Sequence, residues 1–206
     1  MFVDIHTHLD NQSVIKIVDE FSEEKILKTW GIHPWEVDVI ANEVPRDLRS
    51  LGMTEAIGEV GLDKVHKETF EKQIDVFGEM IRLSETLKKP VIVHCVRAYS
   101  EIIEMRKKTQ ATMPWVIHGF NSSVETMRQL LRYDIYISLG EILYRNENQA
   151  VEILKNIPLD RLFLETDVSG RDISDVYAKA ASLMGCEIGF LCKQIFENYG
   201  RLEATH

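Results

Sequence analysis

Cysteine is scarce in this chain, and the few cysteines form no metal or redox motif. The 206 residues include 3 cysteines, Cys95, Cys186 and Cys192, and none belongs to a Cys-x-x-Cys pair. This small, odd number argues against a disulfide framework and favours reduced thiols. We therefore expect a cytoplasmic protein.

Long apolar runs and leader sequences are also missing. No stretch approaches the roughly 18 consecutive apolar residues of a membrane-spanning helix. The first residues, Met-Phe-Val-Asp-Ile-His-Thr-His, lack the basic and apolar regions of a signal peptide. We find no internal repeat, low-complexity tract or linker-like segment. The expectation is one domain over residues 1–206, with no membrane association and no obligate protein partner.

Positive charge is in deficit. Lys and Arg number 24 against 33 Asp and Glu, which gives a net charge of -9 at pH 7. That balance excludes broad, non-specific coating of nucleic acid. It still permits a nucleic-acid substrate held locally by a few cationic side chains and metal ions.

Apolar runs of strand and helix type alternate along the chain. The predicted strands cover residues 2–8, 13–18, 26–32, 53–60, 90–95, 114–118, 134–139 and 161–166. The predicted helices cover residues 68–87, 98–108, 148–156, 173–184 and 187–199, and one more opens at the capping box Ser122-Ser123-Val124-Glu125.

This alternation predicts an α/β fold with parallel strands and helical crossovers, and the length suits a small (β/α)8 TIM barrel. His8 and His33 are too close in sequence for two full strand–helix units. We therefore expect a shortened first β-α unit that lacks a proper helix. A doubly wound open sheet is the structural alternative.

Side chains of metal-ligand type end five of the predicted strands. They are His6, His8, Glu59, His94, His118 and Asp167. Because the carboxyl ends of parallel strands meet at one face of a barrel, we expect these side chains to converge. The alternatives are ordinary: hydrogen-bonded core histidines, a glutamate at a strand end and an aspartate that caps a helix.

The mixture of four imidazoles and two carboxylates favours zinc, manganese or a similar divalent ion such as magnesium over calcium. Six ligands exceed the usual shell of one zinc ion, so the sequence predicts two divalent metal ions. We assign catalytic roles to Glu59, which could bridge the two ions, and to Asp167, which could also accept a proton from attacking water.

A series of short motifs, in chain order from residue 4 to residue 167, resembles the TatD-related metal-dependent DNases. The motifs are Asp4-Ile5-His6-Thr7-His8-Leu9-Asp10, Gly31-Ile32-His33-Pro34, Ala56-Ile57-Gly58-Glu59-Val60-Gly61-Leu62-Asp63, Pro90-Val91-Ile92-Val93-His94, Ile117-His118-Gly119-Phe120 and Leu164-Glu165-Thr166-Asp167. The resemblance implies a TIM-barrel hydrolase with divalent metals. It also implies that His6, His8, Glu59 and Asp167 hold one ion, while Glu59, His94 and His118 hold the other.

The loops that would contact substrate depart from the pattern of that family. Cys95-Val96-Arg97-Ala98 stands where the family usually has Ser-Arg-Asp-Ala, and Val168-Ser169-Gly170 follows Asp167 where Pro-Tyr is frequent. Four side chains near the ligand strands are predicted substrate contacts: Arg97, Lys64, His66 and His33. Solvated loop charges, and a structural turn residue at His33, are the alternatives.

The favoured function is therefore a TatD-like deoxyribonuclease that cleaves phosphodiester bonds with metal-activated water. One alternative is hydrolysis of a small phosphate ester, cyclic amide or lactone in the same two-metal site. Another is a metal-stabilised scaffold without catalytic activity. The expected partner is accordingly DNA or a small phosphoester substrate.

Overall fold

The computed structural model describes residues 1–10, 12–18, 24–40 and 54–204. In this part of the chain, eight strands form one sheet whose spatial order follows the sequence. The strands are β1 (Phe2–Leu9), β2 (Gln12–Val18), β3 (Lys25–Trp30), β4 (Ala56–Asp63), β5 (Val91–Val96), β6 (Trp115–Ile117), β7 (Ile135–Leu139) and β8 (Leu162–Leu164).

The helices alternate with the later strands. They are α1 (Val37–Ile40), α2 (Phe70–Leu87), α3 (Tyr99–Thr109), α4 (Val124–Leu131), α5 (Ile142–Arg145), α6 (Glu147–Asn156), α7 (Ile173–Met184) and α8 (Ile188–Glu203), with short 3₁₀ turns at Lys67–Thr69 and Leu159–Arg161. Helix α4 is capped by Ser123, whose hydroxyl accepts a hydrogen bond from Thr126 N, one residue later than the predicted cap. No helix in the described ranges is long and apolar enough to cross a membrane.

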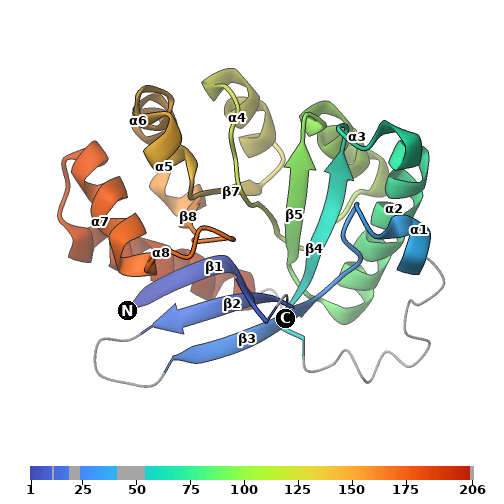
Figure 1. Ribbon diagram of the computed structural model, residues 1–206, viewed down its shortest axis with the longest axis horizontal. Coiled ribbons are helices and arrows are strands. Elements are labelled where there is room, and N and C mark those ends of the chain that lie inside the picture. The colour runs from blue at the N-terminus through green and yellow to red at the C-terminus, as the bar shows by residue number, and fades with distance from the viewer. Residues whose placement is uncertain (11, 19–23, 41–53, 205–206) are drawn as a thin grey trace.

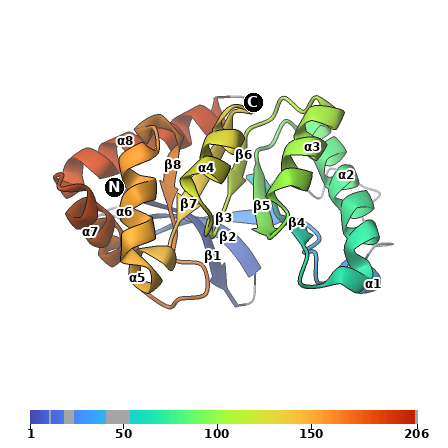
Figure 2. The same cartoon turned by 90° about the horizontal axis from the view of Figure 1, so that it is seen from above.

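Strands β3 to β8 form the parallel part of a barrel. Each is paired in parallel with the next. Strands β4, β6, β7 and β8 are buried along their whole length, as expected for strands covered on both faces. Figures 1 and 2 show helices α2 to α7 arranged in an arc outside these strands. The predicted (β/α)8 barrel is therefore confirmed for this part of the sheet.

Strand β2 corrects the expectation that every strand is parallel. It pairs antiparallel with both β1 and β3. A parallel connection needs a crossover of about a dozen residues, and only residues 10 and 11 separate β1 from β2. The chain therefore turns back at once, and the shortened first unit is a β-hairpin. As a consequence, the first residues of β2 lie at the same face of the sheet as the last residues of the other strands.

The outer side of β2 and β3 has no helix drawn over it, whereas α7 and α8 lie beside β1 (Figure 1). Ile26 on β3 is accordingly 49% exposed. Helical cover begins at β4, against which α2 packs. Strand β4 also extends to Asp63, three residues beyond the predicted end, while the predicted first residue, Met53, lies outside the described residues.

The barrel closes between β1 and β8 with few backbone contacts. Strand β8 has only three residues, and a single parallel bridge joins Thr7 to Asp167. Nearer the start of β1, at Val3, a side chain of α7 takes the hydrogen-bonding place of a neighbouring strand. The Tyr177 hydroxyl accepts a hydrogen bond from Val3 N at 3.1 Å and donates one to Val3 O at 2.9 Å. The backbone of β1 is thereby satisfied where β8 does not reach it.

We predict that Tyr177→Phe lowers the free energy of unfolding by about 1–3 kcal/mol, because it leaves two buried backbone groups of Val3 without their partner. Urea unfolding followed by circular dichroism measures this change. Tyr133→Phe is the matched control, since no hydrogen bond of the Tyr133 hydroxyl is present among the described residues. Equal stability of the two variants would contradict the closing role of Tyr177.

Candidate metal centre

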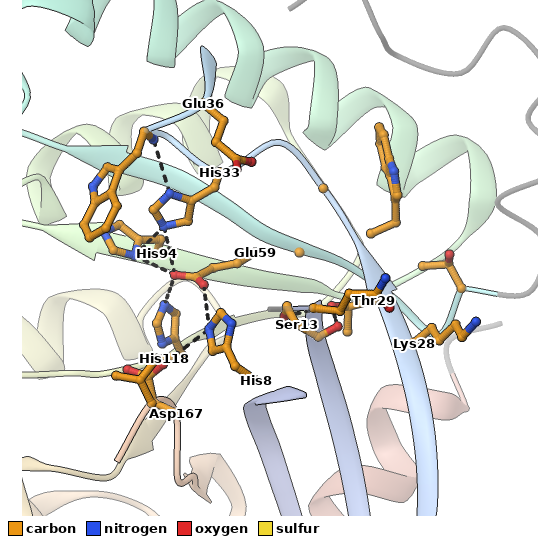
Figure 3. A pocket seen from close by; sticks show the side chains of 17 residues that line it. His8, Ser13, Lys28, Thr29, His33, Glu36, Glu59, His94, His118 and Asp167 are labelled. Atoms are coloured by element: carbon orange, nitrogen blue, oxygen red, sulfur yellow. Dashed lines mark hydrogen bonds and ion pairs between the residues drawn. The ribbon is translucent and has the colours of Figure 1, made fainter. Parts of the chain in front are cut away.

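Glu59 lies at the centre of a cluster of imidazole rings (Figure 3), in the middle of β4 rather than at its end as predicted. Its side chain is buried, and both carboxylate oxygens face histidines. Oxygen Oε1 lies 2.6 Å from His94 Nδ1, 2.7 Å from His118 Nε2 and 3.3 Å from His33 Nε2. Oxygen Oε2 lies 3.3 Å from His6 Nε2 and 3.5 Å from His8 Nε2.

Asp167 completes the second of these groups. Its Oδ1 atom lies 3.5 Å from Nε2 of both His6 and His8. The structure thus brings together all six side chains that the sequence selected. Their ligand atoms form overlapping groups that could each hold a metal ion: His6, His8 and Asp167; His6, Glu59 and His118; and His33, Glu59 and His94.

The convergence follows from where each residue stands in its strand. His6 and His8 are two residues apart near the end of β1, so their side chains share one face of the sheet. Strand β5 approaches β4 unusually closely at Gly61, where a Cβ atom would lie 2.0 Å from the carbonyl oxygen of His94. Gly61 also has a φ of 146°, which side chains disfavour. This close approach places Glu59 and His94 beside each other.

Asp4 fixes the other side of the cluster. Its buried carboxylate accepts hydrogen bonds from Thr166 N at 3.0 Å and from the Thr166 hydroxyl at 2.5 Å. Next along the chain, Asp167 N donates to the carbonyl oxygen of His6 at 3.0 Å. These bonds tie the segment after β8 to β1 and hold Asp167 against His6. Burial raises the pKa of Asp4 to about 6.

The electrostatics of the cluster favour positive charge at its centre. Burial alone would lower the pKa of His6, but the neighbouring carboxylates of Asp167 and Glu59 raise it to about 10. Burial alone would raise the pKa of Glu59, but the surrounding imidazoles, His118 foremost, hold it well below its usual range. The pKa of Asp167 is also lowered, chiefly by His6 against the opposing effect of burial. A divalent cation is a ligand that supplies such charge.

One buried nitrogen that faces the carboxylates makes no hydrogen bond among the described residues. It is His6 Nε2, which lies 3.3 Å from Glu59 Oε2 and 3.5 Å from Asp167 Oδ1. Since buried polar atoms are rarely left without a partner, an unpaired imidazole nitrogen that faces two carboxylates fits a metal ligand. The donor set of imidazoles and carboxylates suits a first-row divalent ion.

Two side chains that the sequence analysis did not select support His6 from behind. The Ser13 hydroxyl lies 3.2 Å from His6 Nδ1, and the Thr29 hydroxyl lies 2.8 Å from both the hydroxyl and the carbonyl oxygen of Ser13. Thr29 donates its proton to the Ser13 hydroxyl, whose oxygen has a second lone pair that can accept a proton from His6 Nδ1. This arrangement leaves His6 Nε2 free to bind a metal ion.

Asp63 supports His94 in a similar way. Its Oδ2 atom lies 3.5 Å from His94 Nε2 and accepts a hydrogen bond from Trp35 Nε1 at 2.7 Å. Gln73 holds the backbone of Asp63 by accepting from its N–H at 2.7 Å and donating to its carbonyl oxygen at 3.2 Å. Asp63 belongs to one of the motifs quoted above, but no role was assigned to it from the sequence. Its position four residues after Glu59 in the same strand is the feature that could have identified it.

Glu165 lies behind His118. Its Oε1 atom is 3.8 Å from His118 Nδ1 and accepts a hydrogen bond from Gly119 N at 2.5 Å. Burial raises the pKa of Glu165 to about 8. Glu165 is only 1% exposed and lies deeper than Asp167, below the cluster.

The predicted substrate contacts are distributed unevenly. His33 joins the cluster itself, 3.4 Å from His94. Lys64 pairs with Glu101 at 2.5 Å, and His66 packs on the Trp35 ring at a centroid distance of 5.3 Å. Arg97 is exposed after β5. Lys64, His66 and Arg97 do not line the cavity that contains Glu59.

That cavity has a volume of about 670 Å³, which suits a small ligand or part of a larger one. It extends from the cluster along β2 and β3, so Ser13, Lys28 and Thr29 lie in its wall together with His8 and His33 (Figure 3). Cys95 next to His94 is buried, and burial raises the pKa of its thiol to about 12. A thiolate nucleophile at this position is therefore disfavoured.

Comparison with known proteins gives one family. The model of the TatD related DNase family matches residues 1–202 of the chain. The uncharacterized metal-dependent hydrolase YcfH of Escherichia coli is 30% identical over 198 residues, which cover 87% of this chain and 74% of that protein. The human 3'-5' RNA nuclease TATDN2 is 32% identical over 155 residues, which cover 70% of this chain and 20% of that protein.

A solved structure agrees with the fold. A TatD family hydrolase from Entamoeba histolytica superposes with a TM-score of 0.75 at 19% identity, covering 85% of this chain and 74% of that chain. The matched part of the chain spans 56% of the length of an uncharacterized metal-dependent hydrolase of Buchnera aphidicola and 74% of that of YcfH. The predicted TIM-barrel fold is confirmed by this likeness.

We predict that Ser13→Ala weakens binding of a divalent cation by about 10- to 100-fold, the usual effect of removing a hydrogen bond behind a metal-ligating histidine. Titration with Mn²⁺ or Zn²⁺ against a chromogenic chelator measures the affinity, and circular dichroism checks the fold. Ser13→Thr keeps the hydroxyl on a strand residue and should bind metal like the parent. Ser100→Ala, on the exposed side of α3, controls for loss of a serine elsewhere. Unchanged affinity in Ser13→Ala would remove Ser13 from the support of His6.

Proposed function

Since this chain belongs to the TatD related DNase family, we propose that it hydrolyses phosphodiester bonds in nucleic acid with two divalent metal ions, and that DNA is its substrate. One observation carries the proposal: the buried Glu59 carboxylate presents one oxygen to His6 and His8 and the other to His94 and His118. A carboxylate placed in this way can bridge two ions.

The metal ligands follow from this division. His6, His8 and Asp167 would hold one ion with Oε2 of Glu59, and His94 and His118 would hold the second with Oε1. His33 is close enough to the second group to serve as a further ligand. When bound, such ions supply Lewis acidity, which lowers the pKa of water toward about 7 and offsets negative charge that develops at phosphorus.

Asp167 is the protein group placed to accept the proton of the attacking water. Both carboxylates line the cavity, but the side chain of Asp167 is 34% exposed and that of Glu59 only 8%. The pKa of Asp167 is held low by His6 against the opposing effect of burial, so the carboxylate form, which can accept a proton, is favoured. The backbone bond to His6 and the Asp4–Thr166 pair fix its position.

The choice of nucleic acid rests on the relatives. The family model is described as DNase, and one relative is named as an RNA nuclease. The cavity along β2 and β3 also offers Lys28 and Trp30 near the cluster. A cationic side chain and an aromatic side chain suit a phosphate and a base, respectively.

The experiment that tests the function compares substrates with one metal-loaded preparation. We expect hydrolysis of a single-stranded oligodeoxynucleotide that stops on chelation and returns with Mn²⁺ or Zn²⁺. Glu59→Gln, which keeps the shape of the side chain but not its charge, should lower kcat by at least about 100-fold and reduce the bound metal. An oligoribonucleotide, a small phosphate ester and a lactone complete the panel. Turnover of the lactone or ester without any cleavage of nucleic acid would overturn the proposed substrate class.

We also expect Asp167→Asn to reduce hydrolysis by about 100- to 10,000-fold, the range for removal of a general base. Metal content is measured on the same sample, because Asp167 is also a proposed ligand. A fully metal-loaded Asp167→Asn protein that turns over like the parent would remove Asp167 from proton transfer. If Asp167→Asn also loses metal, its activity is measured again after metal has been added to saturation. This separates the role of Asp167 as a ligand from its role as a proton acceptor.

A further inference from the structure

A second cavity adjoins the metal cluster on the side away from β2 and β3. It has a volume of about 550 Å³ and lies among the segments that follow β6, β7 and β8. These segments lie at the carboxyl ends of the strands, the face on which active sites of TIM barrels are built. The two cavities share Asp167 and Val168 in their walls, so the cluster stands where they meet.

Two arginines stand in the wall of this second cavity. Arg145 ends helix α5, and Arg171 belongs to the segment after β8. Both contact the same carboxylate: Arg145 Nε lies 3.0 Å from Glu141 Oε1, and Arg171 Nε lies 3.7 Å from Glu141 Oε2. Two positive charges thus contact one carboxylate directly, while the side chains of Glu165 and Asp167 also line the cavity.

The way in which Glu141 pairs with the arginines leaves their terminal nitrogens available. Each ion pair with Glu141 uses Nε, and no hydrogen bond or ion pair of an Nη atom of Arg145 or Arg171 is present within the described part of the chain. The Nη atoms of a guanidinium group form the fork that binds two oxygens of a phosphate. The side chain of Arg145 is 80% exposed and that of Arg171 is 38% exposed, so both can reach a ligand.

Arg171 is the better ordered of the pair. Its guanidinium carbon lies 3.9 Å from the centre of the Tyr144 ring, a stacking contact that restricts the orientation of the group. Gly170, directly before it, has a φ of 66°, a conformation that favours glycine and turns the chain. Arg171 N also donates to the Ser169 hydroxyl at 3.3 Å. The sequence of this segment thus fixes where Arg171 lies.

We propose that this second cavity is an anion subsite that binds the phosphate next to the scissile phosphate of a nucleic-acid strand, with Arg171 as the main contact and Arg145 as the second. The inference rests on the proposed function, since the scissile phosphate belongs at the metal cluster. A strand that crosses the cluster passes Asp167 and enters the second cavity, where the next phosphate meets the guanidinium groups.

The test compares dinucleotides that differ by one phosphate: TpT, pTpT and TpTp, each hydrolysed by the metal-loaded enzyme. The parent should hydrolyse one of the two phosphorylated dinucleotides with a kcat/KM about tenfold above that of TpT, through a lower KM. Arg171→Gln, which keeps a polar side chain but not the charge, should lose most of this gain, and Arg145→Gln should lose a smaller part. Arg128→Gln on α4, whose guanidinium pairs with Asn156, is the control and should keep the whole gain.

Binding supplies a readout that does not depend on cleavage. Fluorescence anisotropy of a labelled single-stranded oligonucleotide gives the dissociation constant at several salt concentrations. Loss of one phosphate contact should reduce the log–log salt slope by about 0.7 in Arg171→Gln. Weakened binding in this variant supports the subsite even where no hydrolysis of nucleic acid occurs, in which case the proposed function alone fails. In a parent that hydrolyses TpT, the subsite is overturned if the added phosphate brings no gain or if the gain persists in Arg171→Gln. With or without hydrolysis, it is overturned if the salt slope is unchanged in Arg171→Gln.

Discussion

A buried carboxylate among imidazole rings is the constraint on which the rest of this site depends. Glu59 is 9% exposed, and such a group is unfavourable in a protein interior unless positive charge or hydrogen bonds compensate. The histidines that surround it come from β1, from β5 and from the segments after β3 and β6. The barrel brings these distant parts of the chain together at one face, and the close approach of β4 and β5 at Gly61 sets the spacing.

The reversal of β2 changes what this barrel offers its metal site. A parallel second strand would point its first residues toward the opposite face. The short connection after β1 instead places Ser13 beside His6, and Thr29 on β3 fixes the Ser13 hydroxyl. The lack of a helix between β1 and β2 and the contact of Ser13 with His6 therefore follow from the same short connection. In the described structure, β2 and β3 also have no helix over their outer side.

Local patterns predicted much of this molecule. Runs of apolar residues identified the parallel strands, because strands covered on both faces are apolar throughout. The polar residue that follows each apolar run identified the members of the cluster. Direction was harder to predict: apolar periodicity identifies β2 as a strand but does not say which way it runs. Ser13, Asp63 and Thr29 were missed as supporting residues because their roles arise from contacts between strands. His33 was expected to contact substrate and lies at the cluster because β3 runs parallel to β4.

The two sides of the metal cluster differ in a way that bears on the substrate. On one side the cavity runs along open strands and has Lys28 in its wall. On the other side the wall contains Arg145 and Arg171, and Tyr144 and Glu141 limit the freedom of Arg171. A site for one small ester needs only the cluster and a closed pocket. Cationic groups on both sides of Asp167, in a chain of net negative charge, are what a strand with several phosphates requires, because each phosphate beyond the scissile one needs its own local compensation.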